Sequence, residues 1–161
     1  MRAPLWICLG LAVPTAPVAV ADNLTRLATL TGKCTAITVM DVVTDPSLCS
    51  NKVVNIEFPN GRLGFMFSLN RKGESPVIVS FFGSGEKQLH ITKDIAMQPI
   101  DQVHFTFQKS TDDLAVAGSC RFSNPYKGVR SQITCSADSS QGKFVGEFIS
   151  DGIAPNTSEI R

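Results

Sequence analysis

From residue 53 onward, apolar and polar residues alternate with a period of two in short segments. Clusters of Gly, Pro, Asn and Ser separate the segments, and this pattern is typical of short antiparallel strands joined by turns. No helical periodicity intervenes, which disfavours a parallel α/β fold. The sequence therefore predicts an all-β antiparallel meander of about eight strands, forming a small barrel or a sandwich. A barrel is slightly favoured, because consecutive hairpins share one apolar face.

The hairpin around Asn60-Gly61 carries the strongest turn signal. Both residues tolerate the positive φ of a type I′ turn, and alternating segments flank them. A two-residue turn would place Phe58 opposite Leu63 and continue with apolar pairs only. Those further pairs are Ile56 with Phe65 and Val54 with Phe67. Because turn chemistry and facial alternation agree, the sequence predicts this register.

The segment 22–32 instead suggests one short amphipathic helix. Asn23 is a possible N-cap and Gly32 a possible stop, and Leu24, Leu27 and Ala28 have helical spacing. The narrow apolar stripe predicts a helix that caps one end of the sheet.

The N-terminus has the features of a secretory signal peptide. Arg2 precedes an apolar run, and Ala19-Val20-Ala21 forms a small-x-small cleavage pattern. Pro14 and Pro17 interrupt the run too early for a transmembrane helix. We therefore expect a signal peptide at 1–21, one β-domain at 22–150 and a polar, flexible tail at 151–161. The expected location is periplasmic or secreted.

Four cysteines follow the expected signal peptide, as two pairs with the same spacing: Cys34 and Cys49, and Cys120 and Cys135. An even number in an exported protein favours disulfides. If Lys127-Gly128 lies at a hairpin centre, Cys120 faces Cys135. Cys34 can reach Cys49 only if the chain turns near Met40-Asp41 or returns after Thr44. Local pairing is the preferred prediction, and the two other connectivities remain alternatives.

The cysteine-containing segments also carry a resemblance to a family. Gly32-Lys33-Cys34, Cys49, Asn60-Gly61-Arg62-x-Gly64-Phe65-x-Phe67 and Cys120 to Gly128 resemble small exported proteins of alphaproteobacteria. The resemblance covers most of the mature chain. It implies a bacterial periplasmic setting and transfers no activity and no functional residues.

Charge and aromatic composition exclude several classes of partner. Of 15 basic residues Arg2 is lost with the signal, so that 14 remain against 14 acidic residues. A neutral chain has no electrostatic basis for binding nucleic acid. The mature chain retains ten Phe, one Tyr and no Trp, since Trp6 also lies in the signal. This composition lacks the aromatic girdles of a membrane barrel, so no integral membrane association is expected after signal removal.

Candidate catalytic residues are few. His90 and His104 lie on the polar sides of their segments and could approach one another if the hairpin turned near Met97. Two histidines without a defined third ligand do not make a metal site. The carboxylates Glu57, Asp101 and Glu147 could serve a glycosidase only if they converged. There is no G-x-S-x-G elbow and no phosphate loop. The sequence therefore predicts no catalytic residues, no metal and no cofactor, and an enzyme is the less favoured hypothesis.

The loop between Cys120 and Cys135 is the best contact candidate. It contains Asn124, the only tyrosine Tyr126, and the cations Lys127 and Arg130. Loops held by a rigid scaffold often bind ligands, although most loop tips are ordinary turns. We expect an exported β-domain that binds an unknown protein or a small apolar ligand. The alternatives are a small periplasmic hydrolase and a secreted enzyme inhibitor.

Overall fold

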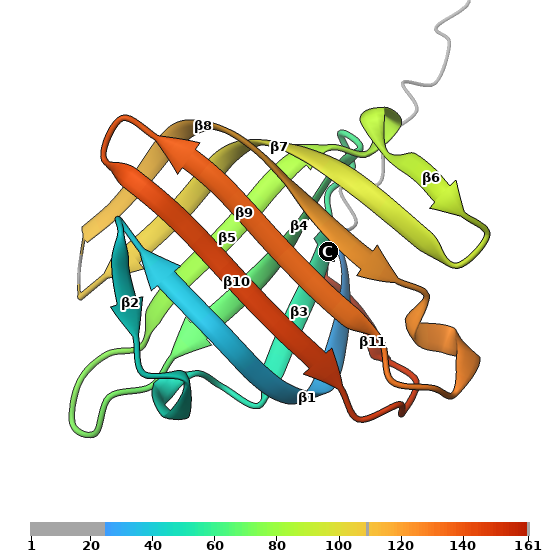
Figure 1. Cartoon of the computed structure of the whole chain (residues 1–161), viewed down its shortest axis with the longest axis horizontal. Coiled ribbons are helices and arrows are strands. Elements are labelled where there is room, and N and C mark those ends of the chain that lie inside the picture. The colour runs from blue at the N-terminus through green and yellow to red at the C-terminus, as the bar shows by residue number, and fades with distance from the viewer. Residues whose placement is uncertain (1–24, 109, 161) are drawn as a thin grey trace, which may run out of the picture.

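The computed structural model describes residues 25–108 and 110–160. This part of the chain forms eleven strands and three short 3-10 helices (Figure 1). The strands are β1 (Thr25–Val39), β2 (Val42–Thr44), β3 (Lys52–Glu57), β4 (Arg62–Leu69), β5 (Val77–Ser84), β6 (Leu89–Thr92), β7 (Ile95–Phe107), β8 (Ser110–Ser123), β9 (Gln132–Ser139), β10 (Gly142–Ser150) and β11 (Asn156–Ile160). The 3-10 helices are η1 (Pro46–Leu48), η2 (Gly85–Lys87) and η3 (Pro125–Lys127). The expected signal peptide at 1–21 lies outside the described residues.

Eight of the strands close into an antiparallel barrel. The order is β1-β3-β4-β5-β7-β8-β9-β10, and β10 pairs back with β1. Strand β1 closes the barrel by pairing with both end strands. Its first half, Arg26 to Thr31, pairs with β3, and its second half, Gly32 to Thr38, pairs with β10. A register shift between Cys34 and Ala36 interrupts the pairing of β1 with β10. The predicted all-β meander is confirmed, and it is a barrel rather than a sandwich.

The helix expected between Asn23 and Gly32 is not formed in the described part of that segment. Residues 25–32 belong to β1, and Ala28 and Leu30 are buried inside the barrel. Helical spacing of three apolar residues was therefore misleading. The β-branched Thr25, Thr29 and Thr31 favour an extended backbone, and pairing with β3 satisfies its hydrogen bonds. Asn23 and Leu24 lie outside the described residues.

Part of the expected flexible tail forms the strand β11. It pairs with Thr25 to Thr29 along the side of β1 that β3 leaves open. The connection from β10 is anchored at Asp151, whose carboxylate accepts a hydrogen bond from the Thr31 hydroxyl (2.5 Å) and another from the Ile153 amide (2.9 Å). These two hydrogen bonds lower the pKa of Asp151. The tail is thus tied to the strand that closes the barrel.

This anchor predicts an acid-sensitive C-terminal segment. Because the pKa of Asp151 in the folded chain lies below its ordinary value of 3.8, ionised Asp151 stabilises the fold at pH above 3.8. That stabilisation is lost as the pH falls through the lowered pKa. Amide exchange in β11 should therefore accelerate below about pH 4 relative to β9. In the Asp151→Asn variant, the amides of β11 should exchange faster at neutral pH, and the acceleration in acid should be absent. A variant whose exchange in β11 depends on pH as the parent's does would contradict the role assigned to Asp151.

The β3–β4 hairpin differs from its predicted register by one residue. The turn is a three-residue loop: the Phe58 amide donates to the Arg62 carbonyl, and the Gly61 amide donates to the Phe58 carbonyl. Gly61 adopts φ +77°, which closes the loop. Consequently Glu57 faces Leu63 and Asn55 faces Phe65. The predicted pairs of Phe58 with Leu63 and of Ile56 with Phe65 are wrong.

Phenylalanine side chains fill the middle of the barrel. Phe67, Phe81, Phe144 and Phe148 are fully buried, with Phe67 and Phe81 in edge-to-face contact at a centroid distance of 5.8 Å. Gly146 lies against this cluster, because a Cβ there would come within 2.8 Å of the Phe67 ring. The barrel therefore has a packed interior, and any binding space must lie toward an end.

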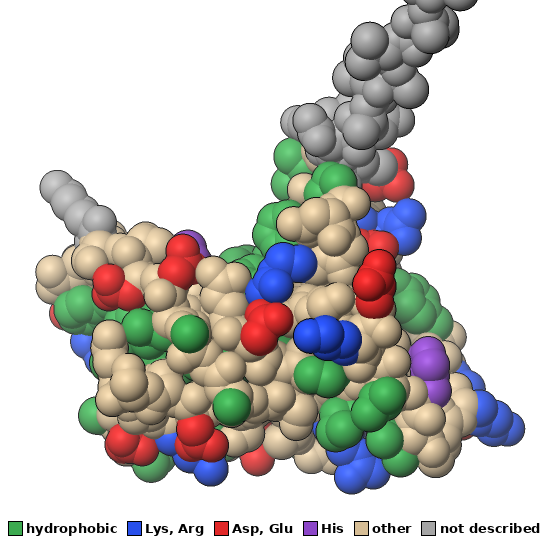
Figure 2. Space-filling view, turned by 90° about the horizontal axis from the view of Figure 1, so that it is seen from above, with side chains coloured by type: hydrophobic (Ala, Val, Ile, Leu, Met, Phe, Trp, Pro, Cys, Tyr) green, Lys and Arg blue, Asp and Glu red, His purple; other side chains and the backbone are tan. Residues whose placement is uncertain are grey.

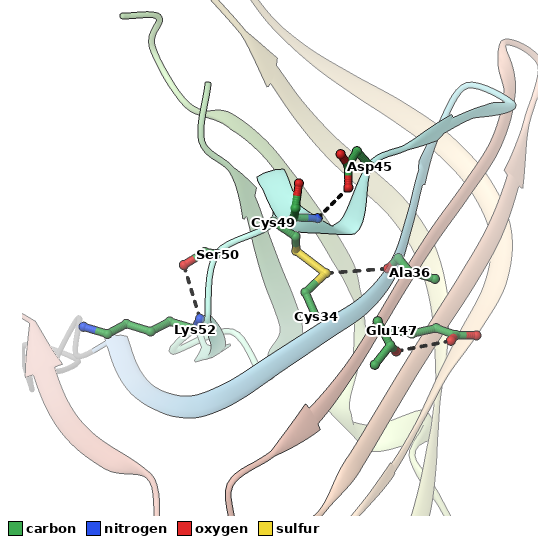
Figure 3. The surroundings of a disulfide bond; sticks show 9 residues. Cys34, Ala36, Asp45, Cys49, Ser50, Lys52 and Glu147 are labelled. Carbon is green, nitrogen blue, oxygen red and sulfur yellow. Dashed lines mark hydrogen bonds between the residues drawn. A yellow bond between two sulfur atoms is a disulfide. The ribbon is translucent and has the colours of Figure 1, made fainter. Parts of the chain in front are cut away.

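Both predicted disulfides are present. Cys120 and Cys135 face each other on β8 and β9, as expected from a hairpin centred on Lys127-Gly128. Cys34 on β1 bonds Cys49, which follows η1 (Figure 3). The chain returns through a tight turn at Met40-Asp41, where both residues have positive φ.

The helix η1 brings Cys49 back to β1. Asp45 caps it by accepting a hydrogen bond from the Ser47 amide (2.8 Å), and hydrogen bonding to Ser47 lowers the pKa of Asp45. The short segment between β2 and Cys49 thus has its own local hydrogen bonds in addition to the disulfide.

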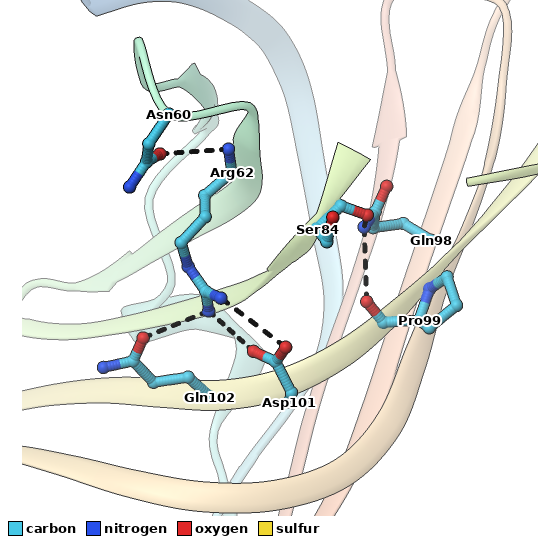
Figure 4. A network of polar contacts seen from close by, with 7 residues as sticks. All are labelled: Asn60, Arg62, Ser84, Gln98, Pro99, Asp101 and Gln102. Atoms are coloured by element: carbon cyan, nitrogen blue, oxygen red, sulfur yellow. Dashed lines mark hydrogen bonds and ion pairs between the residues drawn. The ribbon is translucent and has the colours of Figure 1, made fainter. Parts of the chain in front are cut away.

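The β6–β7 hairpin projects past the end of β5 (Figure 1). Pairing between β5 and β7 ends at Phe82 and Gln102, and β6 replaces β5 as the neighbour of β7. The buried Gln98 fills the gap, donating to the carbonyl of Ser84 at 2.5 Å and to that of Pro99 at 3.3 Å (Figure 4).

Arg62 fixes the β3–β4 turn against the same region of β7. Its guanidinium donates to Asp101 at 2.6 Å and to Gln102 at 3.2 Å (Figure 4). The projecting hairpin is therefore held on both sides of the point where it leaves the barrel.

Candidate functional site

An apolar cavity of about 130 Å³ lies at the end of the barrel that carries η3; we call it the η3-end cavity. Its walls come from inward-facing side chains of five strands: Ala28, Leu30, Asn55, Phe65, Phe122 and Ile133. Phe65 and Phe122 reach toward each other from opposite walls, with ring centroids 5.0 Å apart. The cavity is thus an unfilled continuation of the core.

The roof of the cavity includes Pro125 and Tyr126 from η3 and Pro155 from the segment before β11. Tyr126 is 61% exposed, so it borders both the cavity and solvent. An aromatic ring in this position can cover an apolar ligand while its hydroxyl stays hydrated.

Local hydrogen bonds hold the roof in place. The Asn124 side chain accepts a hydrogen bond from the Tyr126 amide (2.9 Å), and the Asn124 amide donates to the Asp94 carbonyl (2.8 Å). The Lys127 ammonium forms an ion pair with the Asp94 carboxylate. Gly128 then adopts φ +70°, which lets the chain leave η3. The loop is therefore fixed to the β6–β7 turn as well as by the disulfide behind it.

A second hollow of about 210 Å³ lies on the other side of Tyr126; we call it the β6 groove. It shares Phe122, Pro125 and Tyr126 with the η3-end cavity. Its remaining lining comes mainly from the β6–β7 hairpin and includes His90, Lys93 and Asp94. Two hollows with mainly apolar walls thus meet at one aromatic side chain, and of the two only the β6 groove has charged side chains in its lining.

The structure divides the residues predicted as a binding loop. Tyr126 borders both hollows, Asn124 lines the β6 groove, and Lys127 forms the ion pair with Asp94. Arg130 lies elsewhere, beside Arg121 in a separate hollow on the outer face of the barrel.

Asn55 was missed by the sequence prediction. The predicted register assigned Val54 and Ile56 to the interior, whereas the one-residue shift turns Asn55 inward. Its side-chain amide donates to the Gly64 carbonyl (3.0 Å), which makes this polar group compatible with a partly buried position. The signal that could have revealed it is Pro59, which favours a longer turn than Asn-Gly alone.

The two histidines do not approach one another as a hairpin centred near Met97 would require. The hairpin turns at Lys93-Asp94, and His90 lies opposite Ala96. His104 instead lies opposite Ser80, and its Nδ1 is 2.7 Å from an oxygen of Asp113. Among residues 25–108 and 110–160, no group of three or more His, Cys, Asp or Glu side chains could hold a metal ion.

Ser80, His104 and Asp113 lie opposite one another on β5, β7 and β8, in an order like that of a serine hydrolase triad. Geometry argues against this chemistry. Ser80 is 2% exposed, and within the described chain no side-chain hydrogen bond joins it to His104. The row lies within paired strands, whose ladder hydrogen bonds occupy the backbone N–H groups that an oxyanion would need.

The carboxylates considered for glycoside hydrolysis are also separate. Glu57, Asp101 and Glu147 each contact a different neighbouring side chain, respectively Arg26, Arg62 and Thr35. They lie on β3, β7 and β10 and do not form a facing pair. A catalytic role for them has no geometric support.

Charged side chains of both signs lie close together over one face of the molecule (Figure 2). Four ion pairs of Lys or Arg with Asp or Glu link described residues, including Arg26 with Glu57 and Lys127 with Asp94. Such mixed charge produces no extended field of one sign on that face. The absence of nucleic-acid binding stays a prediction.

Comparison with known proteins gives no assignment: no protein-family model, curated protein or solved structure matches this chain. Within the described residues, no helix has the length and apolar character needed to cross a membrane. The site must therefore be interpreted from its own geometry.

Proposed function

We propose that this chain is an exported binding protein that holds a small apolar group in the η3-end cavity. The observation that carries the proposal is an unfilled apolar space lined by Leu30, Phe65, Phe122 and Ile133 at the end of a packed barrel. Ligand sites commonly combine apolar walls with a few polar groups that set orientation. Asn55 and Tyr126 are the polar groups here.

The cavity volume limits the ligand. An apolar cavity of about 150 Å³ accommodates a benzene molecule, so about 130 Å³ accepts one aromatic ring or a short hydrocarbon chain. Binding free energy per heavy atom falls from about 1.5 kcal/mol in the best very small ligands to about 0.3 kcal/mol in drug-sized ones, so about 0.7 kcal/mol per atom suits a ligand of six to eight heavy atoms. We therefore expect Kd values on the order of 0.1–1 mM for a ring alone.

Two disulfides support the exported location. One bond joins β8 to β9 and the other joins β1 to the segment after η1, and such bonds persist in oxidising compartments such as the periplasm. A periplasmic or secreted binding protein also agrees with the signal-like N-terminus. Peptide mapping of the N-terminus of the exported protein tests cleavage after Ala21.

Filling the cavity should abolish binding. Replacing Ala28, a buried lining residue, by Val and then by Leu places progressively more side chain inside the η3-end cavity. Fluorobenzene affinity, measured by ¹⁹F NMR, should fall moderately in Ala28→Val and by tenfold or more in Ala28→Leu. The matched control is Ala117→Leu, on the exposed side of β8, which should bind as the parent does. Equal binding by all four proteins would refute the assigned site.

A further inference from the structure

The β6 groove has mainly apolar walls, and several of the polar side chains in its lining can donate hydrogen bonds. Lys93 contributes an ammonium group, and the amide side chains of Gln88 and Asn124 each contribute an NH₂ group. The Asn124 oxygen already accepts from the Tyr126 amide, which leaves its NH₂ group as its contribution to a ligand. A ligand group that accepts hydrogen bonds therefore fits this groove best.

The charge of the groove also favours a ligand group that accepts hydrogen bonds. Asp94 is the acidic residue of its lining, and Lys127 neutralises it in an ion pair. Lys93 and His90 have no ion pair or side-chain hydrogen bond with another described residue. The uncompensated charge at the groove is thus positive, and it lies across Tyr126 from the apolar cavity.

We infer that the ligand is a small carboxylate with one aromatic ring or a short acyl chain. This inference rests on the proposed function, since the ring or chain would occupy the η3-end cavity. The carboxylate would lie in the β6 groove beside Lys93, where a charge-assisted hydrogen bond is stronger than one to a neutral group. Tyr126 would cover the junction between the two parts of the ligand.

The test compares two probes of nearly equal shape, 4-fluorobenzoate and 4-fluorobenzamide, by ¹⁹F NMR titration of the full mature chain. The parent protein should bind the carboxylate about tenfold more tightly than the amide at low salt. This preference should shrink as ionic strength rises, because Lys93 is exposed and its charge is screened. The Lys93→Gln variant should bind both probes equally.

Lys87→Gln is the matched control, because Lys87 precedes the same hairpin and does not line the groove. It should keep the preference for the carboxylate. Equal affinity of the parent for both probes would overturn the carboxylate assignment and leave the apolar site intact. Loss of the preference in Lys87→Gln, or its retention in Lys93→Gln, would also overturn it. Binding of neither probe would refute the proposed function itself.

Discussion

Replacing Cys120 and Cys135 together by alanine should lower the free energy of unfolding by about 3 kcal/mol or more. The bond links residues 15 apart, and the chain-entropy model assigns about 3 kcal/mol to a loop of that size. Both residues are fully buried, so the double variant also loses packing inside the barrel. Denaturant unfolding measures the loss, and Tm should fall by roughly 10 °C.

The second disulfide provides a matched comparison. Cys34 and Cys49 are also 15 residues apart, so the chain-entropy contribution is the same. Cys49 is only half-buried, however, and η1 keeps its own capping hydrogen bond. The Cys34→Ala/Cys49→Ala variant should therefore lose about 1 kcal/mol less than the Cys120/Cys135 variant. A larger loss at 34–49 would contradict the packing argument.

Strand alternation was sufficient to predict an antiparallel all-β domain, because each strand has one face in a single core, but it left both a barrel and a sandwich open. The same reasoning paired Cys120 with Cys135, since a turn centred on Lys127-Gly128 sets them opposite each other. Both predictions depend on contacts between neighbouring segments of the chain. Local sequence patterns indicate contacts of this kind directly. They do not indicate the pairing of β10 with β1, because these two strands are far apart in the sequence.

The β3–β4 hairpin shows where local reasoning fails. Asn60-Gly61 alone predicts a two-residue turn, but Pro59 and the positive φ of Gly61 produce a three-residue loop. A shift of one residue exchanges the two faces of a strand. Ile56, which was predicted to face the core, therefore does not, and Asn55 lines the cavity instead.

The helix prediction for the N-terminal segment was wrong for a different reason. A stretch of eleven residues with a possible cap and stop is compatible with a helix or a strand, and local propensity does not decide between them. Here, pairing with β3 and β11 decides in favour of the strand, and both partners are distant in sequence. Tertiary context therefore overrode the helical spacing.

Only part of the candidate site could be predicted. Tyr126 and Asn124 were identified because they lie on a loop fixed by a disulfide. The cavity itself joins residues as distant as Ala28 and Pro155, and no local pattern shows that these positions leave a space unfilled. The ion pair of Lys127 could not be predicted either, because its partner Asp94 lies in another hairpin.

The packed middle of the barrel predicts the largest loss from a single side chain. Phe67 is 1% exposed and contacts Phe81 edge to face. Phe67→Ala should lower the free energy of unfolding by about 3–5 kcal/mol, because it removes a buried ring and leaves a cavity. Denaturant unfolding at neutral pH measures the change.

A substitution at Gly146 tests one particular contact of Phe67, the one that its ring makes across the barrel with β10. An added Cβ would lie 2.8 Å from the Phe67 ring, so Gly146→Ala should cost about 1–3 kcal/mol through overpacking. Combining it with Phe67→Leu should cost less than the sum of the two single changes, by about 1 kcal/mol.

Gly118→Ala is the control for that cycle, because its added Cβ would meet the backbone carbonyl of Ser136 at 2.2 Å. A smaller side chain at position 67 cannot relieve a clash with backbone on β9, so Phe67→Leu and Gly118→Ala should be additive. Additivity in both cycles would mean that Phe67 does not pack on Gly146. Since Phe67 and Gly146 come from β4 and β10, coupling between them alone would show that the closed barrel forms in solution with its interior filled.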